Sequence, residues 1–336
     1  MNKKYKVGII GAGAIVESGH IPVLKVLPGV SIEWIYDRDN SRSGLLSKMF
    51  QIPVLANKNV EAAIEDIDIC LLTIPYGARR EYIEMCAKRN KALYIEKPFA
   101  VSVKEHNECC SMFDASKLAV GFQRRYYQVV ELLRNITASQ PFGQLHSIVF
   151  NQGYFSIKGN KEFLSNASLS GGGIIIESAI HTLDQLLLIT GSEAVTVKEV
   201  SSFQKNGIDY DSVFDTILLS KTNMIHVKAA VSTLRNLRNG VQLVFEHASV
   251  ECNMSPGGKI DLFDNSGKRL DLNVALSGTP GSDSKHTNSI TAAFYLFWSD
   301  FLVAISTQTP NRTSAVNSLL TSSWIEQIYT KINQAG

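Results

Sequence analysis

The stretch KVGIIGAGAIV, residues 6–16, decides the fold of the first part of the chain. A short apolar run of strand type leads into a glycine turn, and a helical pattern follows the turn at once. In a dinucleotide-binding unit the first glycine, Gly11, allows the tight turn, and the second, Gly13, lets a pyrophosphate approach the backbone. Ala14 and Ile15 then open the helix whose free N–H groups meet the phosphates. The stretch therefore predicts the first strand, turn and helix of a Rossmann-type unit.

The match at the turn is partial, and the strand that follows strengthens it. Val16 stands at the third fingerprint position, where a small residue allows closer packing, and an ordinary tight turn would need no ligand. The next strand-like run ends on Asp37, 24 residues after Gly13, where the dinucleotide fold places an acid on the ribose hydroxyls. Asp37 should repel a 2′-phosphate and favour NAD. The neighbouring Arg38 could instead hold that phosphate, which leaves NADP open.

Strands and helices continue to alternate up to residue 122. The later strands are expected at 67–74, 93–95 and 118–122, and the helices at 41–50, 60–64, 79–89 and 103–112. Alternation at this spacing predicts a parallel sheet with right-handed crossovers. We therefore expect an α/β dinucleotide-binding Rossmann domain over residues 1–122.

One strand of this alternation ends on the segment Glu96-Lys97-Pro98. Pro98 cannot donate to a sheet ladder, so it stops the strand there. In open α/β sheets ligands bind outside the carboxyl ends of the strands, so Lys97 should share a crevice with the glycine turn. A strand end with solvated charges is the plainer alternative, because lysine and glutamate are mostly exposed.

Beyond residue 122 the pattern changes to long runs of alternating apolar and polar residues. They cover 144–157, 195–203, 212–219, 224–234, 240–245 and 249–254, and a hairpin over 258–272 follows. Helices are expected at 128–136, 289–305 and 313–332. This pattern predicts a second domain over residues 123–336, of α+β class, with a large, mainly antiparallel open sheet.

A glycine run, Gly171-Gly172-Gly173, opens a further predicted helix over residues 174–189. Glu177, His181 and Asp184 follow at i, i+4 and i+7, so they should share one face of this helix. A histidine held by two carboxylates on a surface helix would explain the pattern, and a catalytic base would explain it equally. A metal site is not predicted, because no fourth clustered ligand is visible.

The composition narrows the possible partners. The chain has 336 residues, of which 33 are basic and 31 acidic, so its formal net charge is only +2. This balance favours neither nucleic acid nor an anionic membrane as a partner, and the absence of a run of 18 apolar residues predicts no membrane span. Five cysteines without CxxC spacing indicate reduced thiols and a cytoplasmic protein, rather than a disulfide framework or a zinc site.

Taken together, these elements resemble the glucose–fructose oxidoreductase / inositol dehydrogenase (Gfo/Idh/MocA) family over nearly the whole chain. The resemblance rests on the motifs above and on Thr73-Ile74-Pro75, Gly121-Phe122 and Arg124-Arg125. It implies a bound nicotinamide cofactor, NAD or NADP, and a sugar-like substrate. It also implies an open sheet used in contacts between copies, hence a homo-oligomer (dimer or tetramer), and a cis bond between Lys97 and Pro98.

The resemblance also assigns roles to individual residues. Lys97 matches the family's conserved lysine and His181 its catalytic histidine, while Glu177 stands where the family usually has Asp. Tyr76 and Arg79 replace the usual Asn and His, and Ala179 replaces a common Gly. The cofactor-binding residues are expected to be Gly11, Gly13, Ala14, Ile15, Asp37, Arg38, Thr73, Pro75, Tyr76, Glu96 and Lys97. The substrate-binding residues are expected to be Lys97, Gln123, Arg125, Tyr154 and His181.

These roles lead to a mechanism hypothesis for a secondary alcohol on a sugar, polyol or sugar derivative, held between the domains. His181 takes the hydroxyl proton, and hydride leaves the same carbon for the nicotinamide. Lys97 donates to the substrate oxygen and stabilises its alkoxide character. Glu177 orients the ring of His181 and stabilises the imidazolium that forms.

Two other functions remain open at this stage. One is a non-redox enzyme that uses a bound NAD transiently, as in the glycosidase branch of the superfamily, which would release no free NADH. The other is a non-catalytic nucleotide-sensing regulator of the same architecture. Such a sensor would need neither Lys97 nor His181, so their presence favours an NAD(P)-dependent dehydrogenase or reductase.

Overall fold

A computed structural model describes residues 4–55, 59–155, 166–221, 223–271 and 287–335. The chain forms two compact units. The first contains Met1–Ala100, Lys104–Gln123 and Ile290–Leu319, and the second contains Val101–Val103, Arg124–Ser289 and Leu320–Gly336. This division differs from the expected domains, 1–122 and 123–336, chiefly because residues 290–319 belong to the first unit.

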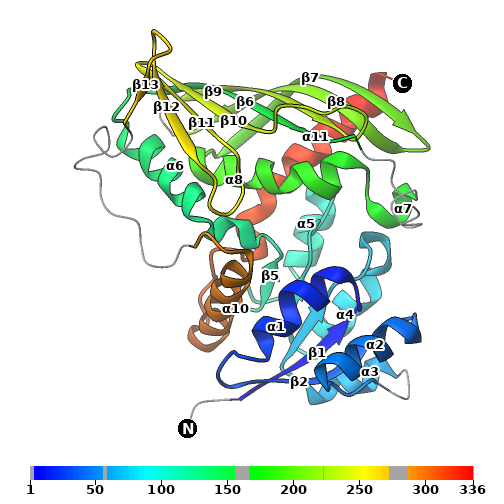
Figure 1. Cartoon of the computed structure of the whole chain (residues 1–336). Coiled ribbons are helices and arrows are strands. Elements are labelled where there is room, and N and C mark those ends of the chain that lie inside the picture. The colour runs from blue at the N-terminus through cyan, green and yellow to red at the C-terminus, as the bar shows by residue number, and fades with distance from the viewer. Residues whose placement is uncertain (1–3, 56–58, 156–165, 222, 272–286, 336) are drawn as a thin grey trace. The chain divides into compact units, whose positions relative to one another are not determined.

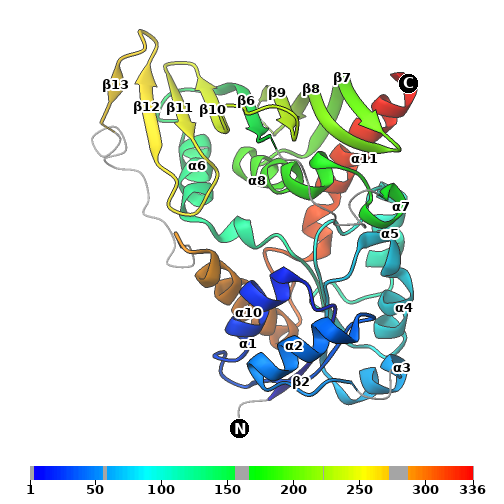
Figure 2. The same ribbon diagram turned by 45° about the vertical axis from the view of Figure 1, so that its right-hand side comes forward.

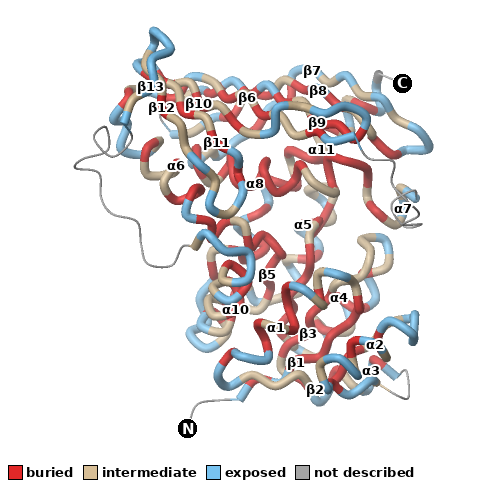
Figure 3. The backbone as a smooth tube through the Cα atoms, in the orientation of Figure 1, coloured by how far each residue is buried: buried red, intermediate tan, exposed pale blue. Residues whose placement is uncertain are grey.

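The first unit is built on a five-stranded parallel sheet. Its strand order is β2-β1-β3-β4-β5, and every neighbouring pair is parallel. The strands are β1 Tyr5–Ile10, β2 Val30–Tyr36, β3 Ile69–Leu72, β4 Ala92–Ile95 and β5 Leu118–Val120. Strands β3, β4 and β5 consist entirely of buried residues, as expected for strands covered on both faces. Figure 3 shows β3 and β5 in the colour of buried residues. The predicted Rossmann fold is confirmed.

Helices connect these strands in the order expected for crossovers. After the glycine turn a π-helical turn, η1 Val16–His20, leads into α1 Ile21–Leu24, which is followed by α2 Asn40–Phe50 and α3 Val60–Ala63. The remaining helices are α4 Arg80–Lys88 and α5 Val103–Cys110. Asp39 begins α2 by accepting the backbone N–H of Ser41 with its carboxylate, a typical N-cap contact.

Helix α10, Ile290–Thr307, completes the first unit from far along the sequence. Figure 2 shows α10 beside α1. Four of its aromatic side chains, Phe294, Phe297, Trp298 and Phe301, are fully buried, and Tyr295 is exposed. Trp298 stacks on Tyr94 of β4 with ring centroids 4.8 Å apart. These buried rings therefore form part of the core of the first unit. Burial of that aromatic surface explains why α10 departs from the predicted domain division.

The second unit is built on an eight-stranded sheet with the order β13-β12-β11-β10-β6-β9-β8-β7. All pairs are antiparallel except β6 with β9, so the predicted mainly antiparallel sheet is confirmed. The strands are β6 Leu145–Gly153, β7 Ala194–Lys205, β8 Ile208–Leu219, β9 Met224–Ser232, β10 Gly240–Phe245, β11 Ala248–Cys252, β12 Ile260–Asp264 and β13 Arg269–Leu270.

Helices cover one face of this sheet (Figure 1). They are α6 Gln128–Ser139, α7 Ala167–Ser170, α8 Ile180–Thr190 and α11 Leu319–Ala335. Along β9 and β10 buried apolar residues alternate with more exposed ones, which is the pattern of a sheet covered on one side. Trp324 of α11 anchors this layer, because its indole N–H donates to Thr216 of β8 at 3.1 Å.

Two helical segments are long and apolar enough to cross a membrane by length and composition alone. They are Ala167–Thr190, of which 83% is buried, and Ile290–Thr307, of which 33% is buried. Buried core helices pass the same test, so the expectation of no membrane span stays a prediction. It counted uninterrupted apolar runs, whereas mean hydropathy tolerates interspersed polar residues such as Ser178 and His181. Both segments bury residues against protein in this fold.

Candidate active site

The glycine turn after β1 leaves room for a ligand at one of its two glycines. Gly11 has φ +108°, and an added Cβ there would collide with Thr73 at the end of β3. At Gly13, by contrast, no heavy atom lies within 4 Å of an added Cβ. The first glycine therefore permits the turn, and the backbone at the second is open enough for a phosphate to approach. Helical structure begins at Ala14 and Ile15.

Asp37 lies against this turn. Its Oδ2 accepts the backbone N–H of Ala12 at 2.7 Å, and its Oδ1 accepts the N–H of Asp39 at 2.9 Å. Arg42 contacts the same turn, because its Nε donates to the carbonyl of Ala12 at 3.2 Å. Arg38 is exposed, and within the described residues its side chain forms no hydrogen bond or ion pair. A carboxylate, two arginines and an open glycine fit the ribose and phosphates of a nicotinamide dinucleotide.

Arg42 was missed by the sequence reasoning. It lies four residues after Arg38 and two residues inside helix α2. A basic residue in the first turn of that helix was the available signal. Its contact with the glycine turn could not be predicted, because it depends on how α2 packs.

The carboxyl ends of β3 and β4 carry the next group of predicted residues. The Lys97–Pro98 bond is cis, as expected. Lys97 is partly buried. Beyond β3, Thr73 donates its hydroxyl to Ile10 of β1 at 3.1 Å. Pro75 precedes a 3-10 turn, η3 Tyr76–Ala78, and the hydroxyl of Tyr76 donates to Glu105.

Arg79 holds the two strand ends together. Its Nε donates to the carbonyl of Ile74 at 2.8 Å, and its Nη1 donates to the carbonyls of Glu96 and Pro98 at 2.6 and 2.5 Å. Its side chain is buried, and burial lowers the pKa of the guanidinium to about 10 despite the opposing effect of Glu96. The residue that departs from the family pattern thus fixes the backbone on both sides of Lys97.

Glu96 points into the core of the first unit. Its Oε1 lies 3.0 Å from Nε2 of His20, and Nδ1 of His20 accepts the indole N–H of Trp298 at 3.1 Å. An added Cβ at Gly121 would lie 2.7–2.8 Å from the carboxylate of Glu96, so glycine is required there. The Oε1 atom of Glu96 is therefore engaged within the core, and the contact of Glu96 with the cofactor stays a prediction.

Glu177 and His181 lie on one helix whose first part is π-helical and whose second part is α-helical. A π-helical segment, η6 Ile175–Ala179, precedes the α-helix α8. Glu177 is partly buried and His181 is buried. The prediction of one regular face is corrected, since the wider π turn changes the angle between residues before and after it. Asp184 forms an ion pair with a residue from another element.

That partner is Arg125. Its Nε and Nη2 donate to the two carboxylate oxygens of Asp184 at 2.8 and 2.6 Å, and Thr321 donates to the same carboxylate at 2.9 Å. Both side chains of the ion pair are buried. The pair joins the segment before α6 to α8, so this edge of the Arg125 guanidinium does not serve the predicted substrate contact.

The remaining predicted substrate residues have different surroundings. Gln123, in the first unit, is buried, and its Oε1 has no hydrogen-bond partner among the described residues. Tyr154, in the second unit, is 37% exposed beyond the end of β6. An unpartnered buried oxygen on Gln123 fits a substrate hydroxyl. Tyr154 is exposed, so its position gives no corresponding reason to expect a substrate contact.

The glycine run before η6 is explained by residues that the sequence reasoning missed. Asp209 accepts the backbone N–H groups of Gly173 and Ile175 at 2.6 and 2.9 Å, and the hydroxyl of Tyr329 donates to it at 2.7 Å. An added Cβ would collide with Tyr329 at Gly172 and with the Asp209 backbone at Gly173. The carboxylate thereby caps the start of the helix that carries His181.

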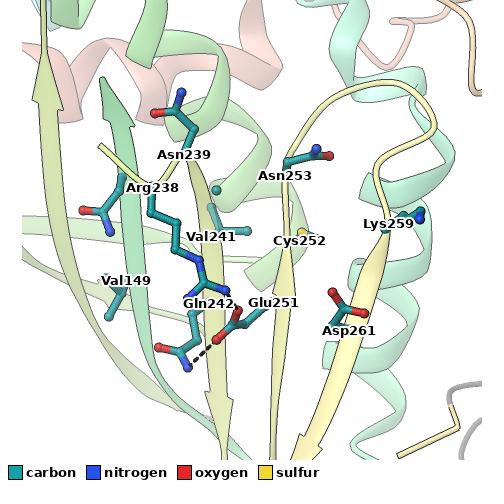
Figure 4. Close-up of a pocket in the computed structure, with 12 residues that line it drawn as sticks. Val149, Arg238, Asn239, Val241, Gln242, Glu251, Cys252, Asn253, Lys259 and Asp261 are labelled. Atoms are coloured by element: carbon teal, nitrogen blue, oxygen red, sulfur yellow. Dashed lines mark hydrogen bonds and ion pairs between the residues drawn. The ribbon is translucent and has the colours of Figure 1, made fainter. Parts of the chain in front are cut away.

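A polar hollow of about 270 Å³ lies on the second sheet. Figure 4 shows side chains of β6, β10, β11 and β12 around it, with Glu251 bonded to Arg238 and Gln242. None of the predicted site residues lines it. Within the described residues, no three His, Cys, Asp or Glu side chains gather in a way that could hold a metal ion.

Sequence comparisons match both halves of the chain to one family. The model of an oxidoreductase family with an NAD-binding Rossmann fold, GFO/IDH/MocA, matches residues 5–123, and the GFO/IDH/MocA C-terminal domain model matches residues 130–254. Among curated relatives, glucose-6-phosphate 3-dehydrogenase of Bacillus subtilis is 23% identical over 57% of this chain and 55% of its own length. Trans-1,2-dihydrobenzene-1,2-diol dehydrogenase of Sus scrofa is 23% identical over 70% of each chain.

The coverage of these relatives is incomplete. The chain spans 55% and 61% of the length of two of them, the Bacillus enzyme and the rhizopine catabolism protein MocA of Rhizobium meliloti.

Solved structures share the fold over nearly the whole chain. Aldose-aldose oxidoreductase from Caulobacter crescentus, complexed with glycerol, has a TM-score of 0.80 at 17% identity and covers 99% of both chains. KijD10, a 3-ketoreductase from Actinomadura kijaniata in complex with NADP, has a TM-score of 0.81 at 13% identity and covers 98% of both. An oxidoreductase from Agrobacterium radiobacter in complex with NAD+ has a TM-score of 0.78 at 19% identity, over 99% of this chain and 98% of that one.

Proposed function

The chain belongs to the GFO/IDH/MocA family of NAD-binding oxidoreductases, and from this membership we propose that it is a nicotinamide-dependent dehydrogenase or reductase. Its substrate is a secondary alcohol or ketone of a sugar, polyol or sugar derivative. The observation that carries the proposal is the first unit's strand edge. There the open glycine turn, Asp37 and Lys97 lie at the carboxyl ends of β1, β2 and β4 of one parallel sheet.

We propose that Lys97 and His181 act on the same substrate oxygen. A bound nicotinamide supplies the hydride acceptor for oxidation, or the donor for reduction. His181 removes the hydroxyl proton, since a neutral imidazole suits a base near neutral pH. Lys97 donates a hydrogen bond to the oxygen as its negative charge develops. Glu177 orients the imidazole, and Gln123 accepts a neighbouring substrate hydroxyl.

The preferred cofactor is NAD. The Asp37 carboxylate faces the turn and would repel a 2′-phosphate, although Arg38 and Arg42 offer positive charge beside it. We propose further that the chain forms a homo-oligomer through the uncovered face of its second sheet, and that it works in the cytoplasm without nucleic acid or membrane.

The catalytic roles are tested by Lys97→Ala and His181→Ala. Each should lower kcat by about 10²–10⁴-fold, because each removes a group that acts on the proton or the charge of the transition state. The affinity for reduced cofactor, measured by fluorescence titration, should change little.

A matched control is Lys104→Ala, an exposed lysine of the same unit. It should retain the activity of the original protein. Full activity in Lys97→Ala or in His181→Ala would refute the assigned roles. Turnover of a glycoside without free reduced cofactor would replace the proposal with the non-redox alternative.

A further inference from the structure

We propose that a buried chain of side chains, Trp298 to His20 to Glu96, positions Lys97 for catalysis. The inference rests on the proposed function for the role of Lys97, but its geometry lies wholly within the first unit. It assigns a positioning role to three residues, two of which the sequence reasoning left without any. Glu96, which the sequence predicts to bind the cofactor, here has the role of supporting its neighbour Lys97.

The two hydrogen bonds of His20 fix its protonation. The indole N–H of Trp298 can only donate, so Nδ1 of His20 must accept it at 3.1 Å. Nε2 therefore carries the proton of the neutral ring and donates it to Oε1 of Glu96 at 3.0 Å. The direction of donation runs from the indole to the carboxylate. Each member satisfies the next, as a buried polar network requires.

The surroundings show that this chain occupies a place where apolar side chains would pack well. His20 is fully buried, with the rings of Tyr94 and Phe294 edge-on at 4.8 Å. Burying a histidine and a carboxylate among aromatic rings costs free energy unless every polar atom is bonded. Gly121 also makes room for the Glu96 carboxylate, as described above. Because well-packed apolar side chains would fill this space at least as stably as even a fully bonded polar network, the arrangement calls for a role beyond filling the core.

Arg79 restrains the same segment from its backbone. It binds the carbonyl groups of Glu96 and Pro98, which flank Lys97. Together Trp298, His20, Glu96 and Arg79 form what we call the Lys97 clamp. The peptide groups on both sides of Lys97 are held by Arg79, and the side chain just before Lys97 is held by His20. The lysine is thus presented from an anchored stretch of backbone, as an active site requires.

The clamp is tested in the full chain with two substitutions of His20 and one matched control. His20→Leu can neither donate nor accept. His20→Gln can do both, since its amide oxygen can accept from Trp298 and its NH2 can donate to Glu96. The control, Phe301→Leu, loosens the same aromatic core, because Phe301 packs on Trp298 with ring centroids 6.1 Å apart but belongs to neither hydrogen bond.

Two readouts are taken on each variant. The first is kcat and KM on an active substrate, with cofactor affinity measured separately. The second needs no substrate: amine labelling followed by mass spectrometry gives the reaction rate of Lys97 relative to Lys104, whose side chain is 86% exposed. A displaced Lys97 should react faster, whereas Lys104 should not change.

In His20→Leu we expect kcat to fall by about 10²-fold with little change in cofactor affinity, since misplacing a catalytic group by about 1 Å has such an effect. We expect Lys97 labelling to rise about threefold or more through easier local opening. His20→Gln should restore most of both, and Phe301→Leu should change neither comparably. Equal losses in His20→Leu and Phe301→Leu, or unchanged Lys97 labelling in His20→Leu, would overturn the clamp. If the original protein turns over no substrate, the proposed function fails while the labelling still decides for or against the clamp.

Discussion

Buried ionisable side chains at the ends of strands and helices are the features that matter at the scale of single residues. Arg79 binds three neutral carbonyl groups, whereas Arg125 binds the carboxylate of Asp184 through two parallel hydrogen bonds. His106 is a third case, since it is buried with its Nε2 3.0 Å from the carbonyl of Ala315. Arg79 holds the backbone on both sides of Lys97, and the pair of Arg125 with Asp184 holds the helix that carries His181.

We predict that His106 makes stability depend on pH. Burial lowers its pKa from 6.5 to about 4, so the folded protein keeps it neutral while the unfolded chain protonates it. Between these values the unfolded state binds more protons, so stability falls as pH falls. The full effect is about 3 kcal/mol, reached below both pKa values. Urea unfolding over this range should show it.

The matched variant is His106→Gln, which keeps an N–H donor for the Ala315 carbonyl but does not titrate. Its free energy of unfolding should fall less steeply than that of the original protein as pH drops from about 6.5 to about 4. Parallel curves for the two proteins would show that His106 contributes nothing to the pH dependence.

At the scale of elements, the sequence predicts strands better than it predicts the ends and inner geometry of helices. Strand β4 and its stop at Pro98 follow from local composition. The π-helical η6 does not, and neither do the contacts that Asp209 and Tyr329 make with Gly172 and Gly173 just before it, which we call the glycine clasp. Asp209 lies 36 residues after Gly173, and Tyr329 lies a further 120 residues after Asp209. Periodicity is a local signal, so it could not reveal them.

We predict that the glycine clasp stabilises the helix that carries His181. Gly172→Ala should lower the free energy of unfolding by about 1–3 kcal/mol more than Gly191→Ala does, because its Cβ meets Tyr329. Gly191 is the control, since its φ is also positive at +59° but no atom lies within 4 Å of an added Cβ. Chemical denaturation measures both.

The collision between an added Cβ at Gly172 and the Tyr329 hydroxyl can also be removed by changing Tyr329. Burial and the neighbouring Asp209 raise the pKa of Tyr329 well above its ordinary value, so its hydroxyl remains a donor. In a Tyr329→Phe background that hydroxyl is absent, and the added cost of Gly172→Ala should shrink. Equal costs of Gly172→Ala in the two backgrounds would show that the glycine clasp is not the cause.

At the scale of the whole molecule, the change in sequence periodicity predicts that there are two units. It does not predict which segments belong to each unit. The glycine turn and alternating elements predict the parallel sheet, and the long alternating runs predict the second sheet. The assignment of α10 to the first unit depends on contacts such as that of Trp298 with His20, which are 278 residues apart. The catalytic candidates carry local motifs. Their supports, Trp298, Asp209 and Tyr329, do not, and packing alone brings them into place.

The central claim is that this chain transfers hydride between a nicotinamide cofactor and a sugar-like alcohol. Its most direct test is the rate of reduced-cofactor formation when the purified full chain is supplied with NAD or NADP and a panel of sugars, polyols and their derivatives. The account predicts substrate-dependent formation of reduced cofactor, matched one to one by ketone product, and faster with NAD than with NADP. Failure of the protein to bind either dinucleotide would contradict it.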